Sequence, residues 1–357
     1  MDKRKLVTLR TIDSITPIAG ADSIEAAHIG GWTSVVRKGE FSEGQKVFYF
    51  ETDSMLPLNK KPFMFLRSRG VTKYDGQEYH LLKVMRLRGV ISDGLVMPIS
   101  ILKDFTSRAG EEEDDDYTDL FGVLKYEDPI DSGSLQFPNW LSKTNELRIQ
   151  NLPELVDYIA KTNSSEAWYA TEKIDGTSCT IWCDGDCGVC SHNYGLASGD
   201  NVYWNIAKTP SINYEGRLLS PLDYLKAKSS GYKRLALQGE IFGEGIQNNP
   251  LGIKGQRILF FNLNVNGAYI TMDTIKTEYK ELLDHWVPIH PISLQPSMEQ
   301  IIAQPDKVTT LVSGAKPVQI EGFVWRNKKA IMIKLPGDEY LRASFKVIAD
   351  RYRLKRS

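Results

Sequence analysis

The chain has 357 residues, of which 41% are hydrophobic and 25% are charged, a composition typical of a soluble globular protein large enough for two compact domains. No apolar run approaches the roughly 20 residues that a membrane helix needs, so we expect no membrane partner. The charged N-terminus leads into no apolar signal core, and we expect no secretion signal. We expect a soluble intracellular monomer, and the cytoplasm, the nucleus and an organelle matrix stay open as locations.

The charge is unevenly distributed along the chain. The net charge is −1 and the isoelectric point is near 6.6, whereas nucleic-acid-binding domains are often strongly basic. However, residues 111–116 form an unbroken acidic run, EEEDDD, and removing these six charges from −1 leaves +5 on the remaining residues. Blocks of like charge repel one another and stay solvated. We therefore predict an acidic linker at residues 106–135, and the net charge argues only mildly against a nucleic-acid partner.

Residues 1–105 have the pattern of a β-rich domain. β-Branched and aromatic runs at residues 6–9, 32–36 and 46–50 are separated by turns rich in glycine, proline and serine. Several short strands with regular turns favour a small barrel. Within it we expect one helical interval at residues 22–27 and a strand pair at residues 81–88 and 94–98.

Two clusters in this domain combine cations with apolar side chains. One is the segment 63–69, FMFLRSR, and the other contains Lys83, Arg86 and Arg88. Aromatic rings interleaved with arginine and lysine suit a groove for a nucleic-acid backbone. The alternating solvent face of a strand explains the same pattern equally well, and both interpretations stay open.

All four cysteines fall in one short stretch, TSCTIWCDGDCGVCS, at positions 179, 183, 187 and 190. The stretch has the pattern of two strands joined by a turn at residues 184–186. Residues three apart in a strand point to opposite faces, so Cys187 and Cys190 diverge and four thiolates do not easily close around zinc. We expect small buried cysteines, with a redox or metal role as the alternative.

The second half of the chain alternates strands with a few helices. Residues 151–160 are a predicted helix, with Pro153 in its first turn. From residue 168 to residue 346 strands dominate, and we expect helical stretches near residues 221–227 and 273–284.

The first chemical signal is the segment 171–178, TEKIDGTS, between two predicted strands. A lysine at a strand end, here Lys173, can attack phosphorus if its amine is neutral. Free lysine has a pKa of about 10.4, so a neighbouring cation or metal must lower it. Gly176 would let the backbone approach a nucleotide. Taken alone, the pattern K-x-D-G is weak, and a lysine in a surface turn would explain it.

Further motifs follow in a fixed order. They are Ser-His-Asn at 191–193, Gly-Glu-Ile at 239–241, a Phe-bearing strand at 258–263, Glu-Gly-Phe-Val at 321–324 and Ser-Phe-Lys-Val-Ile at 344–348. Together with K-x-D-G, this order resembles the covalent nucleotidyltransferase superfamily, which comprises polynucleotide ligases and mRNA capping enzymes. The resemblance runs from about residue 144 to residue 355.

The layout resembles one branch of this superfamily, the ATP-dependent RNA ligases with an N-terminal OB domain. Only 11 residues follow Lys346, too few for the C-terminal OB domain of DNA ligases and capping enzymes. The string KTNELRIQN at 143–151 is also similar to those RNA ligases. The resemblance implies an α+β fold, with an OB-like barrel at residues 1–105. After the linker, residues 136–357 would form a nucleotidyltransferase domain of antiparallel sheets, the ATP-grasp-like adenylyltransferase fold of ligases.

The resemblance also implies a reaction in three steps. Lys173 would attack ATP to form lysyl-AMP, AMP would pass to an RNA 5′-phosphate, and a 3′-OH would then displace AMP. The cofactors would be ATP and Mg²⁺ or Mn²⁺, and the partner would be RNA with such ends, including ends held in a nicked duplex. A DNA ligase, a GTP-using capping enzyme and an inactive nucleic-acid-binding protein are the alternatives.

Individual roles follow from the resemblance. Lys346 would bind the α-phosphate and lower the pKa of Lys173, with Lys334 as a second candidate. Three carboxylates would hold hydrated metal or ribose hydroxyls: Asp175, Glu240 and Glu321.

The nucleotide pocket would be completed by side chains outside this charged group. Adenine would stack on Phe261, with Phe260 as the competing candidate. The remaining contacts would come from Glu172, Gln150, Gly176, His192 and Asn193. His192 stands where many relatives carry arginine, and histidine can be neutral near pH 7.

Overall fold

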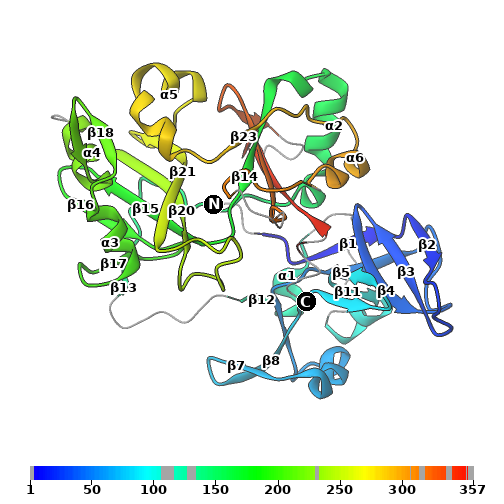
Figure 1. Ribbon diagram of the computed structural model, residues 1–357. Helices are drawn as coiled ribbons and strands as arrows, with labels where there is room; N and C mark the ends of the chain where they lie inside the picture. The colour runs from blue at the N-terminus through cyan, green and yellow to red at the C-terminus, as the bar shows by residue number, and fades with distance from the viewer. Residues whose placement is uncertain are drawn as a thin grey trace. The chain divides into compact units, whose positions relative to one another are not determined.

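The computed structural model describes residues 4–105, 116–126, 134–229, 233–305, 307–312, 318–334, 340–350 and 352. The chain divides into two compact units, one within the first 129 residues and one from Ile130 to Tyr352 (Figure 1). The division falls inside the segment predicted as a linker. Residues 106–115 and 127–133 of that segment lie outside the described residues.

The N-terminal unit consists of short antiparallel strands with little helix. One sheet has the order β1 (Val7–Thr11), β5 (Lys46–Phe50), β11 (Leu95–Pro98), and a second has β2 (Ser14–Pro17), β3 (Ile24–Ile29), β4 (Trp32–Arg37). A third has β12 (Leu124–Lys125), β6 (Ser54–Pro57), β8 (Gln77–Leu81), β7 (Thr72–Tyr74), and β9 (Met85–Leu87) pairs with β10 (Val90–Ser92). The helical segments are η1 (Lys61–Arg69), η2 (Ile99–Asp104) and α1 (Thr118–Phe121).

The core of this unit is aromatic, and it includes part of the predicted linker. The rings of Phe48, Phe50, Phe63 and Phe121 meet edge to face at centroid distances from 4.8 to 6.3 Å. Tyr117 and Phe121 come from the described middle of the predicted linker and are buried. Edge-to-face rings add to the free energy gained from apolar burial.

Two local predictions in this unit are wrong. Residues 22–27 are not helical, because β3 forms a hairpin with β4 through Gly30 and Gly31, both with positive φ, as a two-residue turn requires. Strand pairing outweighs the intrinsic helix propensity of Ala26 and Ala27. Residues 94–98 do not pair with 81–88, because β11 pairs with β5.

The C-terminal unit contains two larger antiparallel sheets, which Figure 1 shows as separate layers. The seven-stranded sheet has the order β13 (Ser134–Leu135), β17 (Gly195–Leu196), β16 (Cys187–Cys190), β15 (Thr177–Cys183), β20 (Leu235–Gly243), β21 (Gln256–Val265), β22 (Ala268–Tyr269). The four-stranded sheet has β23 (Ile289–His290), β14 (Trp168–Lys173), β24 (Gly322–Asn327), β27 (Ser344–Ile348). Two hairpins pair β18 (Ile212–Tyr214) with β19 (Arg217–Leu219) and β25 (Met332–Lys334) with β26 (Tyr340–Arg342).

Helices cover the outer faces of these sheets. They are η3 (Ile149–Asn151), α2 (Pro153–Thr162), η4 (Ser165–Ala167), α3 (Val202–Lys208), α4 (Pro221–Lys228), α5 (Met272–Glu278), η5 (Lys280–His285) and α6 (Met298–Ala303). The predicted helices near residues 151–160, 221–227 and 273–284 are thus confirmed, as is the α+β class with antiparallel sheets. No helix among the described residues is long and apolar enough to cross a membrane.

The cysteine stretch forms the predicted hairpin of β15 and β16. Cys179 and Cys190 are free and buried, and burial raises the pKa of the Cys190 thiol to about 12. Cys183 and Cys187 stand directly opposite each other and form a disulfide, which we did not predict. The pairing explains it, because directly opposed residues of an antiparallel pair bring their Cβ atoms close together.

Candidate active site

Lys173 ends β14 and points away from the apolar core of its sheet. On one face, Ala170, Phe323 and Phe345 are buried in the core. Because side chains alternate along strands, the residues paired with Lys173 and its neighbours share the other face. This face includes Lys173, Val324 and Lys346 from three adjacent strands. The Nζ of Lys173 donates to Oε2 of Glu321 at 2.8 Å.

Three carboxylates surround the Lys173 amine. Burial lowers the pKa of Lys173, but the attraction of Glu321, Glu240 and Asp175 outweighs this effect, so the pKa is raised above its ordinary value. Burial, together with the negative charges of Glu321 and Asp175, raises the pKa of Glu240 to about 8. Lys173 is therefore protonated in this structure and forms a 2.8 Å ion pair with Glu321.

Two glycines bring these groups together. A Cβ on Gly176 would lie 2.2 Å from the carbonyl oxygen of Ile241, and a Cβ on Gly322 would lie 2.0 Å from that of Val347. Both distances are too short for any other residue. Gly176 thus presses the Lys173 loop against β20, which carries Glu240, and Gly322 lets β24 lie close to β27, which carries Lys346.

The two candidate phosphate-binding lysines differ in position. Lys346 lies on β27, half-buried, and its charge acts on both Glu240 and Glu146. Lys334 is exposed on β25, in a separate hairpin. The structure thus brings Lys346, and not Lys334, to the face of the sheet that presents Lys173.

The two candidate adenine-stacking rings also differ. Phe260 is fully buried in the core. The β20–β21 pairing shifts register between Gln238 and Gly239, so that Phe261 is the extra residue of a β-bulge. Phe261 is only partly buried, and the Arg326 guanidinium lies 5.5 Å from its ring centroid. Of the two rings, Phe261 is the one available to a ligand.

Glu172 and Gln150, both predicted to contact the nucleotide, are buried. The Glu172 side chain points to the face opposite Lys173, where it accepts one hydrogen bond from Thr309 at 2.5 Å and lies 3.3 Å from Nε2 of His290, so the structure does not bring it to the Lys173 face. Gln150 is buried in η3, and its Oε1 has no hydrogen-bond partner among the described residues. A buried carbonyl oxygen without a partner is costly, so this atom is suited to accept from a bound ligand.

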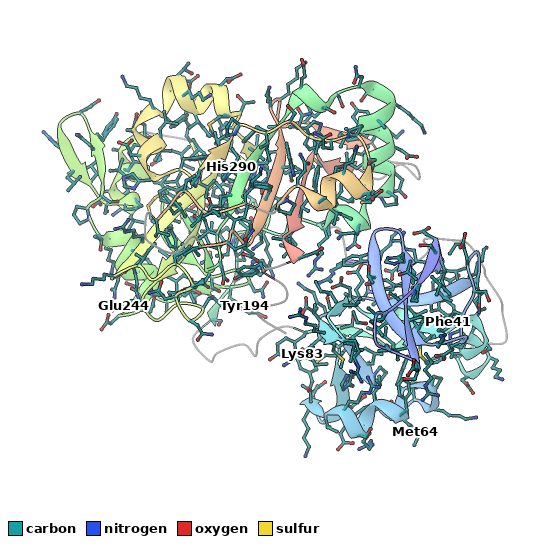
Figure 2. All side chains as sticks on the ribbon, turned by 45° about the vertical axis from the view of Figure 1, so that its right-hand side comes forward. Phe41, Met64, Lys83, Tyr194, Glu244 and His290 are labelled. Atoms are coloured by element: carbon teal, nitrogen blue, oxygen red, sulfur yellow. A yellow bond between two sulfur atoms is a disulfide. The ribbon has the colours of Figure 1, made fainter. Side chains whose placement is uncertain are left out.

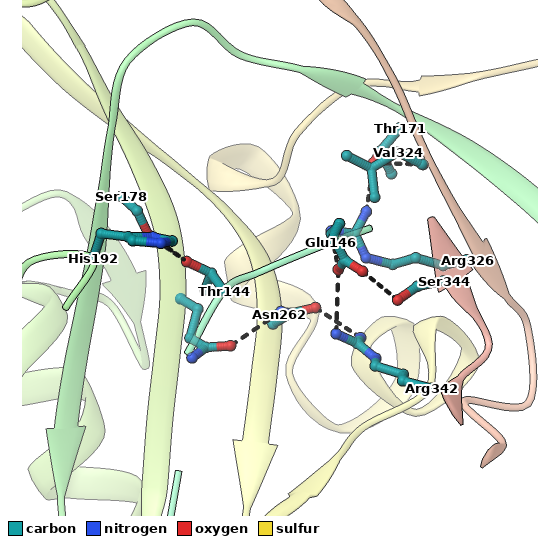
Figure 3. A network of polar contacts seen from close by, with 11 residues as sticks. Thr144, Glu146, Thr171, Ser178, His192, Asn262, Val324, Arg326, Arg342 and Ser344 are labelled. Atoms are coloured by element: carbon teal, nitrogen blue, oxygen red, sulfur yellow. Dashed lines mark hydrogen bonds and ion pairs between the residues drawn. The ribbon is translucent and has the colours of Figure 1, made fainter. Parts of the chain in front are cut away.

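His192 and Asn193 lie in the turn between β16 and β17. The Thr144 hydroxyl lies 3.5 Å from Nδ1 of His192 and 2.6 Å from the Ser178 hydroxyl (Figure 3). Lys143 Nζ lies 3.5 Å from Oδ1 of Asn193. Ser178 pairs with Glu240 across β15 and β20, so these side chains extend the polar face that begins at Lys173.

A charged network beside this face was not predicted. Glu146 pairs with Arg326 at 3.7 Å and Arg342 at 3.4 Å and accepts a short hydrogen bond from Ser344 (Figure 3). Asn262 accepts from Arg342 at 3.0 Å. The arginines lie 180 and 196 positions after Glu146. Only the string at residues 143–151, which contains Glu146 and Arg148, signals this network in the sequence.

The site suits a hydrated divalent cation better than a fully protein-bound one. Among the described residues, no three His, Cys, Asp or Glu side chains group closely enough to hold a metal alone. Burial, followed by the negative charges of Glu321 and Asp175, raises the pKa of Glu240, and a bound cation would favour its charged form. Magnesium commonly keeps several waters and binds through one or two carboxylates and substrate phosphates.

Comparisons with known proteins bear on both units. Residues 6–99 match a family model described as an OB-fold domain, and residues 166–348 match one described as RNA ligase. No curated protein matches the chain significantly. Solved structures of Naegleria gruberi RNA ligase are similar over both full lengths. A mutant with AMP and Mn is 33% identical over 99% of each chain with a TM-score of 0.77, and the protein with PPi is 32% identical over the same shares with 0.76.

A further mutant of that ligase, with ATP and Mn, is 33% identical over 98% of this chain and 99% of its own, with a TM-score of 0.76. The OB-fold match covers the N-terminal unit and the ligase match covers the sheets that carry Lys173, Glu240, Glu321 and Lys346. The chain therefore belongs to the RNA ligase family.

Proposed function

We propose that the chain is an ATP-dependent RNA ligase that joins 3′-OH and 5′-phosphate ends through AMP bound covalently to Lys173. The observation that carries the proposal is the Lys173 ammonium, paired with Glu321 inside a ring of carboxylates and sharing a sheet face with Lys346. The similar ligase structures contain ATP, AMP and Mn, which fits this chemistry.

In the first step the Lys173 amine attacks the α-phosphorus of ATP, an N–P bond forms and pyrophosphate leaves. The protonated amine, which donates a hydrogen bond to Glu321, must first lose a proton. Lys346 supplies a positive charge for the α-phosphate oxygens. Glu321, Glu240 and Asp175 would hold hydrated Mg²⁺ or Mn²⁺, whose charge would offset theirs and favour the neutral amine.

Adenosine would occupy the polar face beside Lys173. Phe261 offers a ring for the base, and Gln150 offers a buried acceptor without a partner. His192 and Asn193 lie farther along the same face, where the RNA 5′ end would enter. Glu172 lines the pocket beside Lys173, and Gly176 lets the loop after Lys173 lie close to β20.

In the second and third steps AMP passes to the RNA 5′-phosphate, and the 3′-OH then attacks that phosphate and expels AMP. We propose a role in RNA repair at nicked duplexes, because both ends are then held together by a template. A soluble monomer would suffice for this reaction.

The N-terminal unit would hold the RNA. Residues 60–90 contain eight lysines and arginines and two acidic residues. Phe65 is 50% exposed on η1 and Tyr74 is 41% exposed on β7, and Figure 2 shows Met64 at the outer edge of this unit. Exposed rings among cations suit stacked bases and phosphates.

The test is incubation with α-labelled ATP and Mg²⁺ or Mn²⁺ followed by denaturing electrophoresis. Wild type and Lys161→Met, whose lysine is exposed on α2, should carry label, and Lys173→Met should not. Labelling by GTP and not by ATP would instead indicate a capping-type enzyme. A folded, initially AMP-free protein that takes no label from either nucleotide would refute the proposal.

A further inference from the structure

The chain folds back onto the site after β27. The backbone N–H of Ala349 donates to the carbonyl oxygen of Glu321 at 2.8 Å, and that of Tyr352 donates to the carbonyl oxygen of Ala349 at 3.0 Å. These bonds place Tyr352 beside the Glu321 backbone. The tyrosine is 8% exposed and lines the same pocket as Lys173, Asp175 and Glu321.

The Tyr352 hydroxyl donates a short hydrogen bond to Oδ2 of Asp175. Asp175 stands two residues after Lys173, in the loop that Gly176 presses against β20, and its charge acts on the Lys173 amine. A phenol is a neutral donor, so it orients the carboxylate without neutralising it as a lysine or arginine would.

We propose that Tyr352 is a positioning residue for Asp175 in the formation of lysyl-AMP, an inference that rests on the function proposed above. The phenol holds one carboxylate oxygen and so fixes the orientation of the Asp175 carboxylate in the pocket of Lys173 and Glu321. The same tail joins β27, which carries Lys346, to the backbone of Glu321. Tyr352 therefore ties the Asp175 loop to the strand of the phosphate-binding lysine.

The decisive variant is Tyr352→Phe, which keeps the ring and removes only the donor. A hydrogen bond to a charged acceptor typically changes a rate by about tenfold or more when it is lost. We expect single-turnover lysyl-AMP formation in Tyr352→Phe to be about tenfold slower than in wild type, with a melting temperature lowered by no more than a few degrees. Tyr340→Phe is the matched control, because Tyr340 is 58% exposed on β26, and it should react like wild type.

A positioning role is separated from a structural one by the dependence on Asp175. In an Asp175→Asn background, adding Tyr352→Phe should slow the reaction by less than twofold, because the carboxylate that the phenol orients is already gone. If Asp175→Asn reacts too slowly, ATP affinity in the non-reacting Lys173→Met background replaces the rate. An equal loss with and without Asp175, or a Tyr352→Phe enzyme as fast as wild type, would overturn the inference. A wild type that takes no label would instead overturn the proposed function and the inference with it.

Discussion

At the scale of single residues, the site is defined by a buried lysine held among carboxylates. Lys173 is surrounded by Glu321, Glu240 and Asp175, and its pKa is raised, although a nucleophilic amine must be neutral. In this structure the lysine is therefore the protonated partner of Glu321. In the proposed reaction, ATP and a divalent cation would have to favour the neutral amine before it attacks phosphorus.

Glu240 makes the stability of the fold depend on pH. Its pKa is about 8 when folded and near the ordinary 4.5 when unfolded, so between these values the folded state binds the extra proton. Unfolding free energy should therefore fall as the pH rises from 5 to 8, by at most about 1.4 kcal/mol per pH unit.

The variant Glu240→Gln should flatten this dependence, because glutamine does not titrate. Urea unfolding of both proteins at pH 5, 6, 7 and 8 measures the difference. If the unfolding free energies of the two proteins changed with pH in the same way, the pKa of Glu240 would not be raised by folding.

At the scale of elements, the sequence predicted correctly those helices and hairpins whose structure is determined by residues close together in the chain. The helix at Pro153–Thr162 and the hairpin of β15 and β16 follow from a first-turn proline and from turn residues. The choice of Phe261 over Phe260 rested on the resemblance alone, because the physical difference between the two rings depends on a bulge set by pairing with β20. The cross-strand disulfide depends on register in the same way.

Because of the bulge, substitution of the two adjacent phenylalanines should affect different properties, stability in one case and ATP binding in the other. Phe260→Ala should lower the unfolding free energy by about 3–5 kcal/mol, because it leaves a cavity in the core. Phe261→Ala should change stability far less and should raise the ATP concentration needed for half-maximal lysyl-AMP formation about tenfold. Denaturant melts and ATP titrations of both variants check this, and a reversed pattern would place the adenine on Phe260.

A second element-scale feature is a cage of three tyrosines around Lys228. Its Nζ lies 4.8, 5.8 and 5.3 Å from the ring centroids of Tyr214, Tyr224 and Tyr279 and 2.8 Å from Glu281. The cage joins α4 to the β18–β19 hairpin and to the segment after α5. Cation–π contacts of this kind contribute about 0.5–2 kcal/mol each, depending on desolvation.

Lys228→Met should therefore lower the unfolding free energy by about 2 kcal/mol without blocking lysyl-AMP formation. The matched control is Lys226→Met, two residues earlier on α4, whose exposed 3.7 Å pair with Asp223 should contribute less than about 0.5 kcal/mol. Equal losses in the two variants would mean that the cage adds nothing beyond a surface ion pair.

At the scale of the whole molecule, the order of motifs identified the ligase sheets, and the early strands identified the barrel. The polar network of Glu146, Arg326 and Arg342 could not be predicted, since its members come from segments far apart in the sequence and no local pattern links them. Clusters of cations in residues 60–90 were visible in the sequence, but their exposure was not. A pattern of charge does not distinguish a binding surface from an ordinary solvent face.

The exposed rings and cations of residues 60–90 lead to a prediction about RNA affinity. Phe65→Ala should weaken binding of nicked RNA about tenfold through lost stacking, and Arg69→Ala should reduce the slope of log Kd against log salt by about one. Neither variant should slow lysyl-AMP formation, and Arg37→Ala, an exposed arginine on β4, is the control. Unchanged affinity and salt slope in both variants would remove the RNA-binding role from this surface.

The covalent intermediate is tested most directly by a chase. The labelled enzyme is purified away from ATP and mixed with a nicked RNA duplex that carries 3′-OH and 5′-phosphate ends. The account predicts that label leaves Lys173, appears on the RNA 5′ end or as free AMP, and that joined strands form without added ATP. Label that stays on the protein, or joining that requires fresh ATP throughout, would contradict it.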